Sequence, residues 1–223
     1  MSQENSLRKG DFRKLFSKAQ KLGWEAKCLP DENQLGSQVF PDPANIFRAL
    51  EIISPSKVRF VILGQDPYPA SQIGYPNRPI ATGIAFGVDP DHIAQRRVHS
   101  SCAIYKVLAG IYGTNPGTRA IRYASSSLIA WATEHKILML NVALTIPKNG
   151  TPGDHIRHWQ NFTQHIITQA RNGRAKPTVI SWGNIAADTA KTHKLISVPH
   201  PSARNGGFKT FWETDIGRSL RAT

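Results

Sequence analysis

The stretch Val58-Arg-Phe-Val-Ile-Leu63, followed by Gly64, reads as a buried β-strand that ends at the glycine. Three similar short apolar runs follow it along the chain, at Ile137–Leu140, Thr178–Ser181 and Leu195–Val198. Short apolar runs bounded by turn residues are typical of strands buried in the middle of a fold. The sequence therefore predicts four short strands.

Helical stretches occupy the segments between these runs. They cover, approximately, Ser100–Ile111, Arg119–Thr133, Ile156–Arg171 and Asn184–Thr192. Strands that alternate with helices require crossover connections, which make the strands parallel and place helices on both faces of the sheet. We expect an α/β fold: a single three-layer domain, residues 1–223, with a central four-stranded, mainly parallel sheet.

Two further helices are expected ahead of the first strand. Apolar residues recur at helical spacing among lysines over residues 1–25, which predicts an amphipathic N-terminal helix. We expect this helix to cover the sheet rather than to bind a partner. Asp42, followed by Pro43, favours the start of a second helix over Ala44–Ile53.

The composition excludes several classes of protein. With 223 residues, of which 40% are hydrophobic, the chain can bury a substantial core, which argues against wholesale disorder. Two cysteines, Cys28 and Cys102, are too few for a disulfide scaffold or a four-cysteine metal site. No apolar run approaches the length of a membrane span, and the N-terminal residues lack the hydrophobic segment that a signal peptide would have. We expect a protein of the cytoplasm (or of the nucleus, for a eukaryotic or viral source) without a membrane partner.

The positive charge is concentrated in one part of the chain. The protein has 28 basic and 15 acidic residues, a net charge of +13. Residues 92–212 hold 15 of the basic residues but only three acidic ones, whereas residues 1–91 are nearly balanced. This asymmetry favours a polyanionic partner held through its phosphates. The alternative is a protein that its charge merely keeps soluble.

Polar side chains follow all four expected strands. They lie in the segments Gln65-Asp-Pro-Tyr-Pro69, Asn141, Trp182-Gly-Asn184 and Pro199-His-Pro-Ser202. Because ligands of open α/β sheets bind outside the carboxyl ends of the strands, we expect these segments to share one site. Each segment alone is weak evidence for a functional site, since an aspartate after a strand is most often a cap and a lone histidine is most often structural. Four strand ends that deliver polar chemistry together favour a functional site.

These segments resemble the main branch of the uracil-DNA glycosylase superfamily. The resemblance rests on Gly64-Gln-Asp-Pro-Tyr68, Gly83-Ile-Ala-Phe86, Leu140-Asn141 through Leu144-Thr145, and His200-Pro-Ser202, and it spans residues 58–212 in the family's order. It implies a monomeric DNA-repair enzyme that needs no cofactor and no metal. Such an enzyme flips uracil out of DNA and hydrolyses its N-glycosidic bond, which leaves an abasic site.

The resemblance implies two catalytic residues. Asp66 would stabilise the cationic sugar and position or deprotonate the attacking water, although an Asp-Pro turn also suits a simple cap. His200 would donate a hydrogen bond to the uracil O2, where negative charge develops as the base leaves. Both roles follow from the charges of the reaction, because cleavage leaves an oxocarbenium-like sugar and an anionic base.

Four residues would recognise uracil. A carboxamide at Asn141 matches the N3–H donor and O4 acceptor of uracil and opposes the reverse pattern of cytosine. Phe86 would stack on the flipped base, although ordinary core packing would also explain it. Tyr68 would exclude the methyl group of thymine, and the backbone N–H of Gln65 would contribute to the anion-binding contacts.

The resemblance also assigns contacts to DNA. Ser202, with Pro201 beside it, and either Ser100 or Ser101 would bind backbone phosphates. Arg204 stands where the family usually has a leucine wedge, and it would either enter the vacated base stack or remain a solvated cation. A protein inhibitor that mimics DNA is a further partner consistent with this family.

The chain departs from the family at several places. Pro69 replaces a usual histidine, the loop Pro69–Thr82 is several residues longer, and His92–Arg97 replaces a proline-rich loop. A histidine-containing segment after Thr145 is matched only by Asp154-His155. These departures leave open a rival function, a uracil- or DNA-binding relative with little or no turnover, and a second, the same reaction on another damaged base.

One pair of histidines could be interpreted as metal ligands. His155 and His158 lie three residues apart on an expected helix, as a metal pair would. Since no third ligand follows at a recognised spacing, we interpret them as residues of a surface helix.

Overall fold

The structure, a computed structural model, describes residues 7–69, 80–89, 102–113, 124–203 and 206–221. Its centre is a four-stranded sheet of order β3-β2-β5-β6, in which all neighbouring strands are parallel. The strands are β2 (Phe60–Gly64), β3 (Ile137–Asn141), β5 (Thr178–Trp182) and β6 (Leu195–Val198). The expected α/β fold is confirmed, with strand bounds within two residues of those expected.

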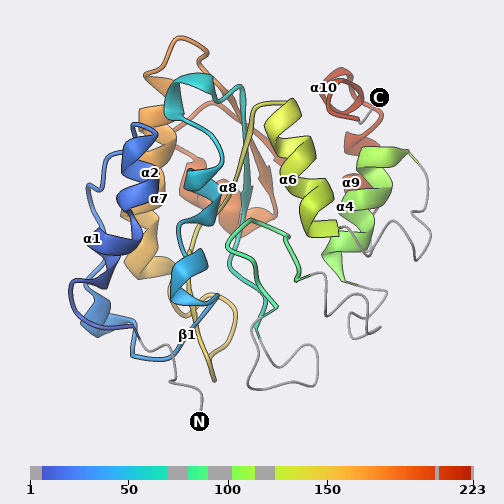
Figure 1. The fold of residues 1–223 in the computed structure, drawn as a ribbon. Coiled ribbons are helices and arrows are strands. Elements are labelled where there is room, and N and C mark those ends of the chain that lie inside the picture. The colour runs from blue at the N-terminus through green and yellow to red at the C-terminus, as the bar shows by residue number, and fades with distance from the viewer. Residues whose placement is uncertain (1–6, 70–79, 90–101, 114–123, 204–205, 222–223) are drawn as a thin grey trace.

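Helices cover both faces of the sheet (Figure 1). One face, which we call the α7 face, packs against α1 (Asp11–Leu15), α2 (Ser17–Lys21), α7 (Ile156–Arg171) and α8 (Asn184–Ala190). The other, the α4 face, packs against α4 (Ala103–Tyr112), α6 (Ala124–Glu134), α9 (Gly207–Phe211) and, near the end of the chain, α10 (Asp215–Ser219).

Successive residues of each strand belong to opposite faces. In β2, Val61 and Leu63 lie in the core of the α7 face, whereas Ile62 lies in the core of the α4 face. In β5, Val179 and Ile180 divide in the same way. Since side chains of a strand alternate with a period of two, a strand buried on both sides must be apolar throughout. This explains why the strands read as continuous apolar runs.

Aromatic rings dominate the core of the α7 face. The ring of Phe12 lies 5.1 Å from that of Trp159, and the ring of Phe47 lies 5.1 Å from Phe16 and 5.9 Å from Phe162. These five side chains are at most 1% exposed. They join the N-terminal segment to α7, so the N-terminal helices cover the sheet.

The N-terminal segment departs from the expected single helix. It forms two helices of five residues each, with Phe16 between them and a left-handed Gly23 after them. Residues 1–6 lie outside the described residues.

The helix expected over Ala44–Ile53 is wrong. The chain forms two short 3₁₀ helices instead, η2 (Pro43–Asn45) and η3 (Arg48–Glu51). Pro43 is the first residue of η2, but two turn residues, Ile46 and Phe47, interrupt the helix before η3 begins. Ile46, Phe47, Ala49, Leu50 and Ile53 are all buried, so this interrupted segment still packs into the core.

The helices after the first strand follow the expected pattern. The bounds of α7 match the expectation, and α8 ends two residues early. The expected first residues of the helices before β3, Ser100 and Arg119, lie outside the described residues. None of the helices in the described part of the chain is long and apolar enough to cross a membrane.

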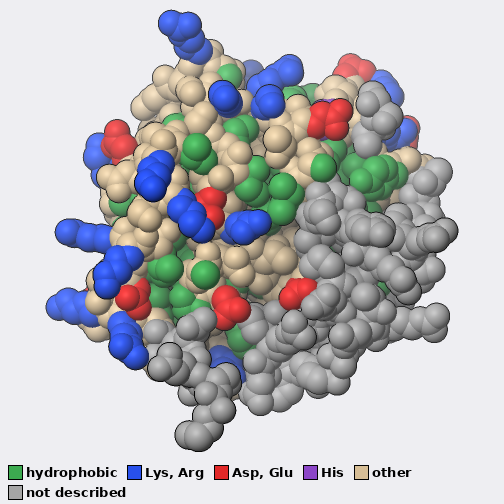
Figure 2. All heavy atoms as spheres, in the orientation of Figure 1, with side chains coloured by type: hydrophobic (Ala, Val, Ile, Leu, Met, Phe, Trp, Pro, Cys, Tyr) green, Lys and Arg blue, Asp and Glu red, His purple; other side chains and the backbone are tan. Residues whose placement is uncertain are grey.

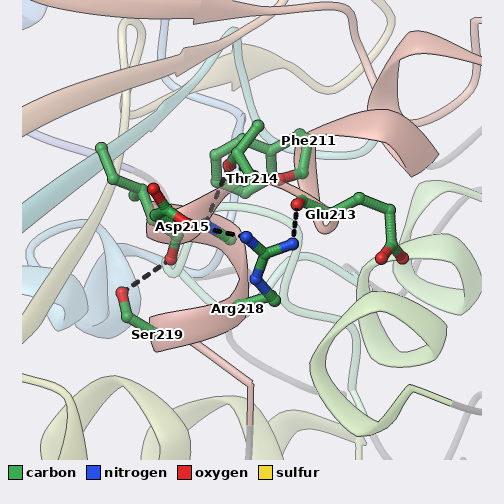
Figure 3. A network of polar contacts seen from close by, with 8 residues as sticks. Phe211, Glu213, Thr214, Asp215, Arg218 and Ser219 are labelled. Atoms are coloured by element: carbon green, nitrogen blue, oxygen red, sulfur yellow. Dashed lines mark hydrogen bonds and ion pairs between the residues drawn. The ribbon is translucent and has the colours of Figure 1, made fainter.

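Short elements complete the fold. A small antiparallel pair joins β1 (Val39–Phe40) to β4 (Ile146–Pro147), and η1 (Glu32–Gln34) and η4 (Pro55–Lys57) lie in connections. The turn between α9 and α10 is closed by a polar network (Figure 3). There Arg218 donates to Asp215 and to the backbone carbonyl of Glu213, and the Thr214 hydroxyl accepts from the N–H of Gly217.

Candidate active site

A pocket of about 180 Å³ lies at the carboxyl ends of the strands. It is lined by Gln65, Asp66, Pro67, Tyr68, Pro69, Phe86, Ala103, Asn141, Pro152 and His200. The parallel register sets Gly64 beside Asn141, so the loop after β2 and the end of β3 meet at this edge. The structure thus brings together all six residues that the sequence analysis selected for catalysis and uracil recognition.

The carboxylate of Asp66 is held by a backbone group from a distant segment. Its Oδ2 accepts a hydrogen bond of 2.6 Å from the N–H of Gly153, and the Gln65 side chain lies 3.4 Å away. Burial raises the pKa of Asp66 above its ordinary value, and the Gly153 bond opposes that rise by stabilising the ionised form. Asp66 is therefore a desolvated carboxylate aimed by one strong donor.

The segment that supplies this donor is a tight turn. Asp154 accepts hydrogen bonds from the backbone N–H and the hydroxyl of Thr151, at 2.8 and 2.9 Å. Gly153 has φ of 101°, a conformation that favours glycine. Sequence reasoning missed Pro152 and Gly153 as site residues, and the Thr-Pro-Gly-Asp run that marks the turn was the available signal.

The imidazole of His200 has a defined tautomer. Its Nδ1 accepts from the N–H of Ser202 at 3.2 Å and lies 2.6 Å from the Ser202 hydroxyl oxygen. An Nδ1 that accepts a backbone N–H leaves the proton of the neutral ring on Nε2. Burial, with a smaller contribution from the charge of Lys106, lowers the pKa of His200. His200 therefore presents a neutral ring with one N–H donor.

Asn141 and Phe86 meet across Gly64. A Cβ atom on residue 64 would lie 2.5 Å from Oδ1 of Asn141 and 3.1 Å from the ring of Phe86. Neither distance is tolerated without a shift, so only glycine lets the amide and the ring approach this closely. Asn141 is 7% exposed, and burial of this kind limits the movement of its amide.

The ring of Phe86 joins the pocket to the core of the α4 face. Phe86 has φ of 63°, which is uncommon for a bulky residue and fixes the direction of its side chain. Its ring centroid lies 5.1 Å from Trp182 and 5.8 Å from His200. Trp182 is fully buried and itself packs on Phe208 at 5.0 Å. Phe86 therefore belongs both to the core and to the pocket wall, so the two interpretations of this residue are compatible.

Tyr68 and Pro69 form another wall of the pocket. The hydroxyl of Tyr68 is buried, and this burial raises its pKa well above the ordinary value. A neutral, immobile ring at this place narrows the pocket. Pro69 lines the same pocket but offers no polar side-chain group.

The structure describes two of the five residues that the sequence analysis assigned to DNA contacts. Pro201 is buried, and Ser202 is exposed while it bonds to His200, so Ser202 also orients the imidazole. Ser100, Ser101 and Arg204 lie outside the described residues, as do His92–Arg97 and most of the loop Pro69–Thr82.

His155 and His158 have separate surroundings. His155 is 5% exposed, and its Nδ1 lies 2.8 Å from the hydroxyl of Thr145, which accepts from the indole of Trp159. His158 is partly exposed, and its ring contacts the Gln34 side chain. The surface interpretation is therefore wrong for His155, which stabilises the start of α7 from inside. Within the described residues, no three His, Cys, Asp or Glu side chains cluster as metal ligands would.

Comparisons with known proteins agree with this geometry. The sequence model of the Uracil DNA glycosylase superfamily matches residues 51–215. The chain is 34% identical over 182 residues to a uracil-DNA glycosylase of Sinorhizobium medicae, covering 79% of this chain and 68% of that protein. It is 30% identical over 203 residues to a uracil-DNA glycosylase of Lactococcus lactis, covering 89% and 80%.

Solved structures show the same fold. The mimivirus uracil-DNA glycosylase superposes with a TM-score of 0.56 at 24% identity, covering 87% of this chain and 69% of that one. The wild-type UNG of Nitratifractor salsuginis gives 0.59 at 19% identity, covering 94% and 95%. A variant of the mimivirus protein was solved in complex with UGI. On the sequence match across residues 51–215, the chain belongs to the uracil-DNA glycosylase superfamily.

Proposed function

We propose that this protein removes uracil from DNA by hydrolysis of the N-glycosidic bond, as a monomeric, single-domain enzyme of base-excision repair. The observation that carries the proposal is one pocket with a partly buried carboxylate on one wall and a neutral imidazole donor on another. The reaction needs these two groups, because a positive charge develops on the sugar while a negative charge develops on the leaving base.

Asp66 serves the sugar and the water. Its carboxylate stabilises the oxocarbenium-like sugar electrostatically, and the bond from Gly153 keeps Oδ2 in place during the reaction. The raised pKa makes this carboxylate a better base than an ordinary aspartate, so it orients the attacking water and takes its proton.

His200 serves the leaving base. Its Nε2–H donates to O2 of uracil, and the charge on the base is delocalised onto this oxygen as the bond breaks. The hydrogen bond at Nδ1 from Ser202 holds the ring in the tautomer that this step requires. No proton needs to be transferred to the base, because a hydrogen bond that strengthens as the anion forms lowers the barrier.

Selectivity comes from the remaining walls. Asn141 pairs with N3–H and O4 of uracil, Phe86 stacks on the ring, and Tyr68 fills the space that a C5 methyl group would need. Cytosine would set a donor against the amide N–H of Asn141 and an acceptor against its carbonyl oxygen, which is strongly unfavourable because Asn141 is buried.

Its substrate places this enzyme where DNA is found: the cytoplasm, or the nucleus for a eukaryotic or viral source. The complex of its mimivirus relative with UGI supports a protein inhibitor that mimics DNA as a partner of the same surface.

The test is release of base from end-labelled oligonucleotides that carry one uracil, thymine or cytosine, with EDTA present. We expect release of uracil only, and its loss in Asp66→Asn and His200→Leu. An intact protein that binds these DNAs and releases nothing would establish the binding relative instead. Release of a different damaged base would point to the second rival function.

A further inference from the structure

A second, larger hollow lies beside the uracil pocket. Its volume is about 590 Å³, and it runs between α4 and the segment that follows His200. Ala109 and Gly110 of α4, with Gly113 just after it, form one side, and Pro201 and Ala203 form the other. Because Pro201 directly follows His200, this hollow, which we call the α4–α9 groove, begins where the catalytic segment ends.

The charged rim of the groove is positive. Lys106 of α4 and Lys209 of α9 line it with exposed side chains. No acidic side chain among residues 7–69, 80–89, 102–113, 124–203 and 206–221 forms an ion pair with either lysine. The acidic residue of the rim, Glu213, already pairs with Arg221 at 2.7 Å. Within the described part of the chain, these two cations therefore face the groove without an ion-pair partner.

The floor of the groove suits a backbone rather than a base. Gly113 and Gly206 have open space beside the position of a Cβ atom, so a ligand reaches the main chain there. Phe208 and Trp212 contribute aromatic edges but are only 4% and 2% exposed, which leaves little ring surface for stacking. Small, weakly polar walls with two lysines match a deoxyribose–phosphate chain, in which sugars alternate with anions.

We infer that the α4–α9 groove holds the sugar–phosphate backbone of the uracil-containing strand on one side of the flipped nucleotide, with Lys106 and Lys209 bound to its phosphates. The inference rests on the proposed function, because a strand whose uracil occupies the pocket must leave past Pro201 or past the opposite wall. DNA binding is then asymmetric: only the nucleotides on one side of the uracil bind in this groove.

The test measures binding separately from catalysis. Single-stranded 15-mers with a central uracil are bound to protein carrying Asp66→Asn, and the anisotropy of a dye on the DNA is followed from 50 to 200 mM salt. Since each phosphate contact contributes about 0.7 to the slope of log K against log salt for single strands, Lys106→Gln with Lys209→Gln should reduce that slope by about 1.4. The matched control is Lys14→Gln with Lys21→Gln, two exposed lysines of α1 and α2. These helices lie on the opposite side of the molecule from α4 and α9 (Figure 1), on the side where Figure 2 shows several Lys and Arg side chains, so this control should change the slope little.

A second pair of variants tests the groove without removing a lysine. Ala109→Glu places a carboxylate in the groove, and Ala109→Gln places a neutral side chain of the same shape there. We expect the glutamate to weaken binding about tenfold more than the glutamine. The defect should need nucleotides on one side of the uracil only, and it should vanish when that flank is removed.

Three results would overturn the inference: an equal change of slope in the α1–α2 control, equal binding by the two Ala109 variants, or a defect that is independent of the flanks. Failure of the proposed function is a separate result, because it would appear as absence of uracil release by the native chain. The binding slopes are measured whether or not that happens.

Discussion

The two faces of the sheet are built from similar residues but are connected to the pocket in different ways. On the α7 face, Phe12, Phe16 and Phe47 pack with Trp159 and Phe162 and do not line the pocket. On the α4 face, Trp182 packs on Phe86, and Phe86 is a wall of the pocket. A substitution in the first cluster should therefore affect stability, whereas one in the second should affect stability and catalysis together.

The largest effect on kcat is expected in the pocket, at Asp66, whose replacement should abolish most of the activity without lowering the stability of the fold. Asp66→Asn should lower kcat by roughly two to four powers of ten, because it removes the base and the negative charge. The same variant should be at least as stable as the native protein at pH 7. The folded-state pKa of Asp66 is raised, so its ionised form opposes folding above the pKa of the unfolded chain, and this penalty disappears in acid.

Chemical denaturation at pH 7 and at low pH, beside single-turnover kinetics, measures both quantities. A variant that is less stable at pH 7 than at low pH, relative to the native chain, would show that Asp66 stabilises the fold.

Phe47→Ala should produce the largest effect on stability alone. It removes a fully buried ring from the α7 face, so the free energy of unfolding should fall by about 3–5 kcal/mol. The kcat of the folded fraction should stay unchanged, since the aromatic rings that pack on Phe47 do not line the pocket. Denaturation curves and active-site titration separate the two, and a fall in kcat per active site would contradict the separation of the faces.

Phe86→Leu is the counterpart on the α4 face. It keeps most of the buried volume but removes the stacking surface, which is worth about 1–3 kcal/mol per base. We expect kcat/KM to fall by about tenfold to a hundredfold, with a smaller loss of stability than in Phe47→Ala. The matched control is Phe47→Leu, in which kcat/KM should be unchanged; equal losses in both leucine variants would refute the comparison.

A smaller effect on kcat/KM is expected at Trp182, which lies behind Phe86 as seen from the substrate. Trp182 contacts no substrate in the proposed mechanism, but it supports Phe86 at 5.1 Å. Trp182→Leu should lower kcat/KM by about tenfold through a displaced Phe86, and Trp182→Phe should restore most of it, because a ring again supports Phe86. If the phenylalanine variant is as slow as the leucine variant, Trp182 does not position Phe86 through its ring.

The smallest effect concerns pH. Activity needs Asp66 ionised and His200 neutral, and both gain a proton as the pH falls. Burial, with a smaller contribution from the charge of Lys106, lowers the pKa of His200, so the acid limb of kcat/KM should be centred below the pKa of about 6.5 of an ordinary histidine. Lys106→Gln should move this acid limb upward by a fraction of a pH unit, because Lys106 disfavours the protonated ring. A limb centred above pH 6.5 in the native enzyme would contradict the buried, neutral His200.

The strands and the pocket were predictable because their signals are local. Each strand is a short apolar run, and the parallel arrangement then brings Asp66, Asn141 and His200 to one edge without further information. The Asp42-Pro43 signal indicates where a helix starts but not how long it is or whether it is α or 3₁₀, so the two short 3₁₀ helices on either side of Phe47 were mispredicted as one longer helix. The buried environment of His155 depends on Thr145 and Trp159, whose hydrogen bonds no spacing rule indicates.

Two features of the site had no readable signal. The left-handed backbone of Phe86 is imposed by its packing, since the sequence Ala-Phe-Gly alone does not demand it. The bond between Gly153 and Asp66 joins residues 87 positions apart, and a main-chain donor has no identity in the sequence. Sequence motifs identify the reacting side chains, but not the backbone groups that aim them.

That bond has a consequence for how the enzyme can be altered. The donor to Asp66 is a peptide N–H, so replacing the side chain at position 153 leaves the N–H in the chain and changes only the φ that aims it. A conventional scan would therefore record a conformational defect and miss the electrostatic one. Replacing the amide of residue 153 by an ester, through semisynthesis, would delete this single donor. It would show how much of the orientation of the Asp66 carboxylate depends on a main-chain group rather than on any side chain.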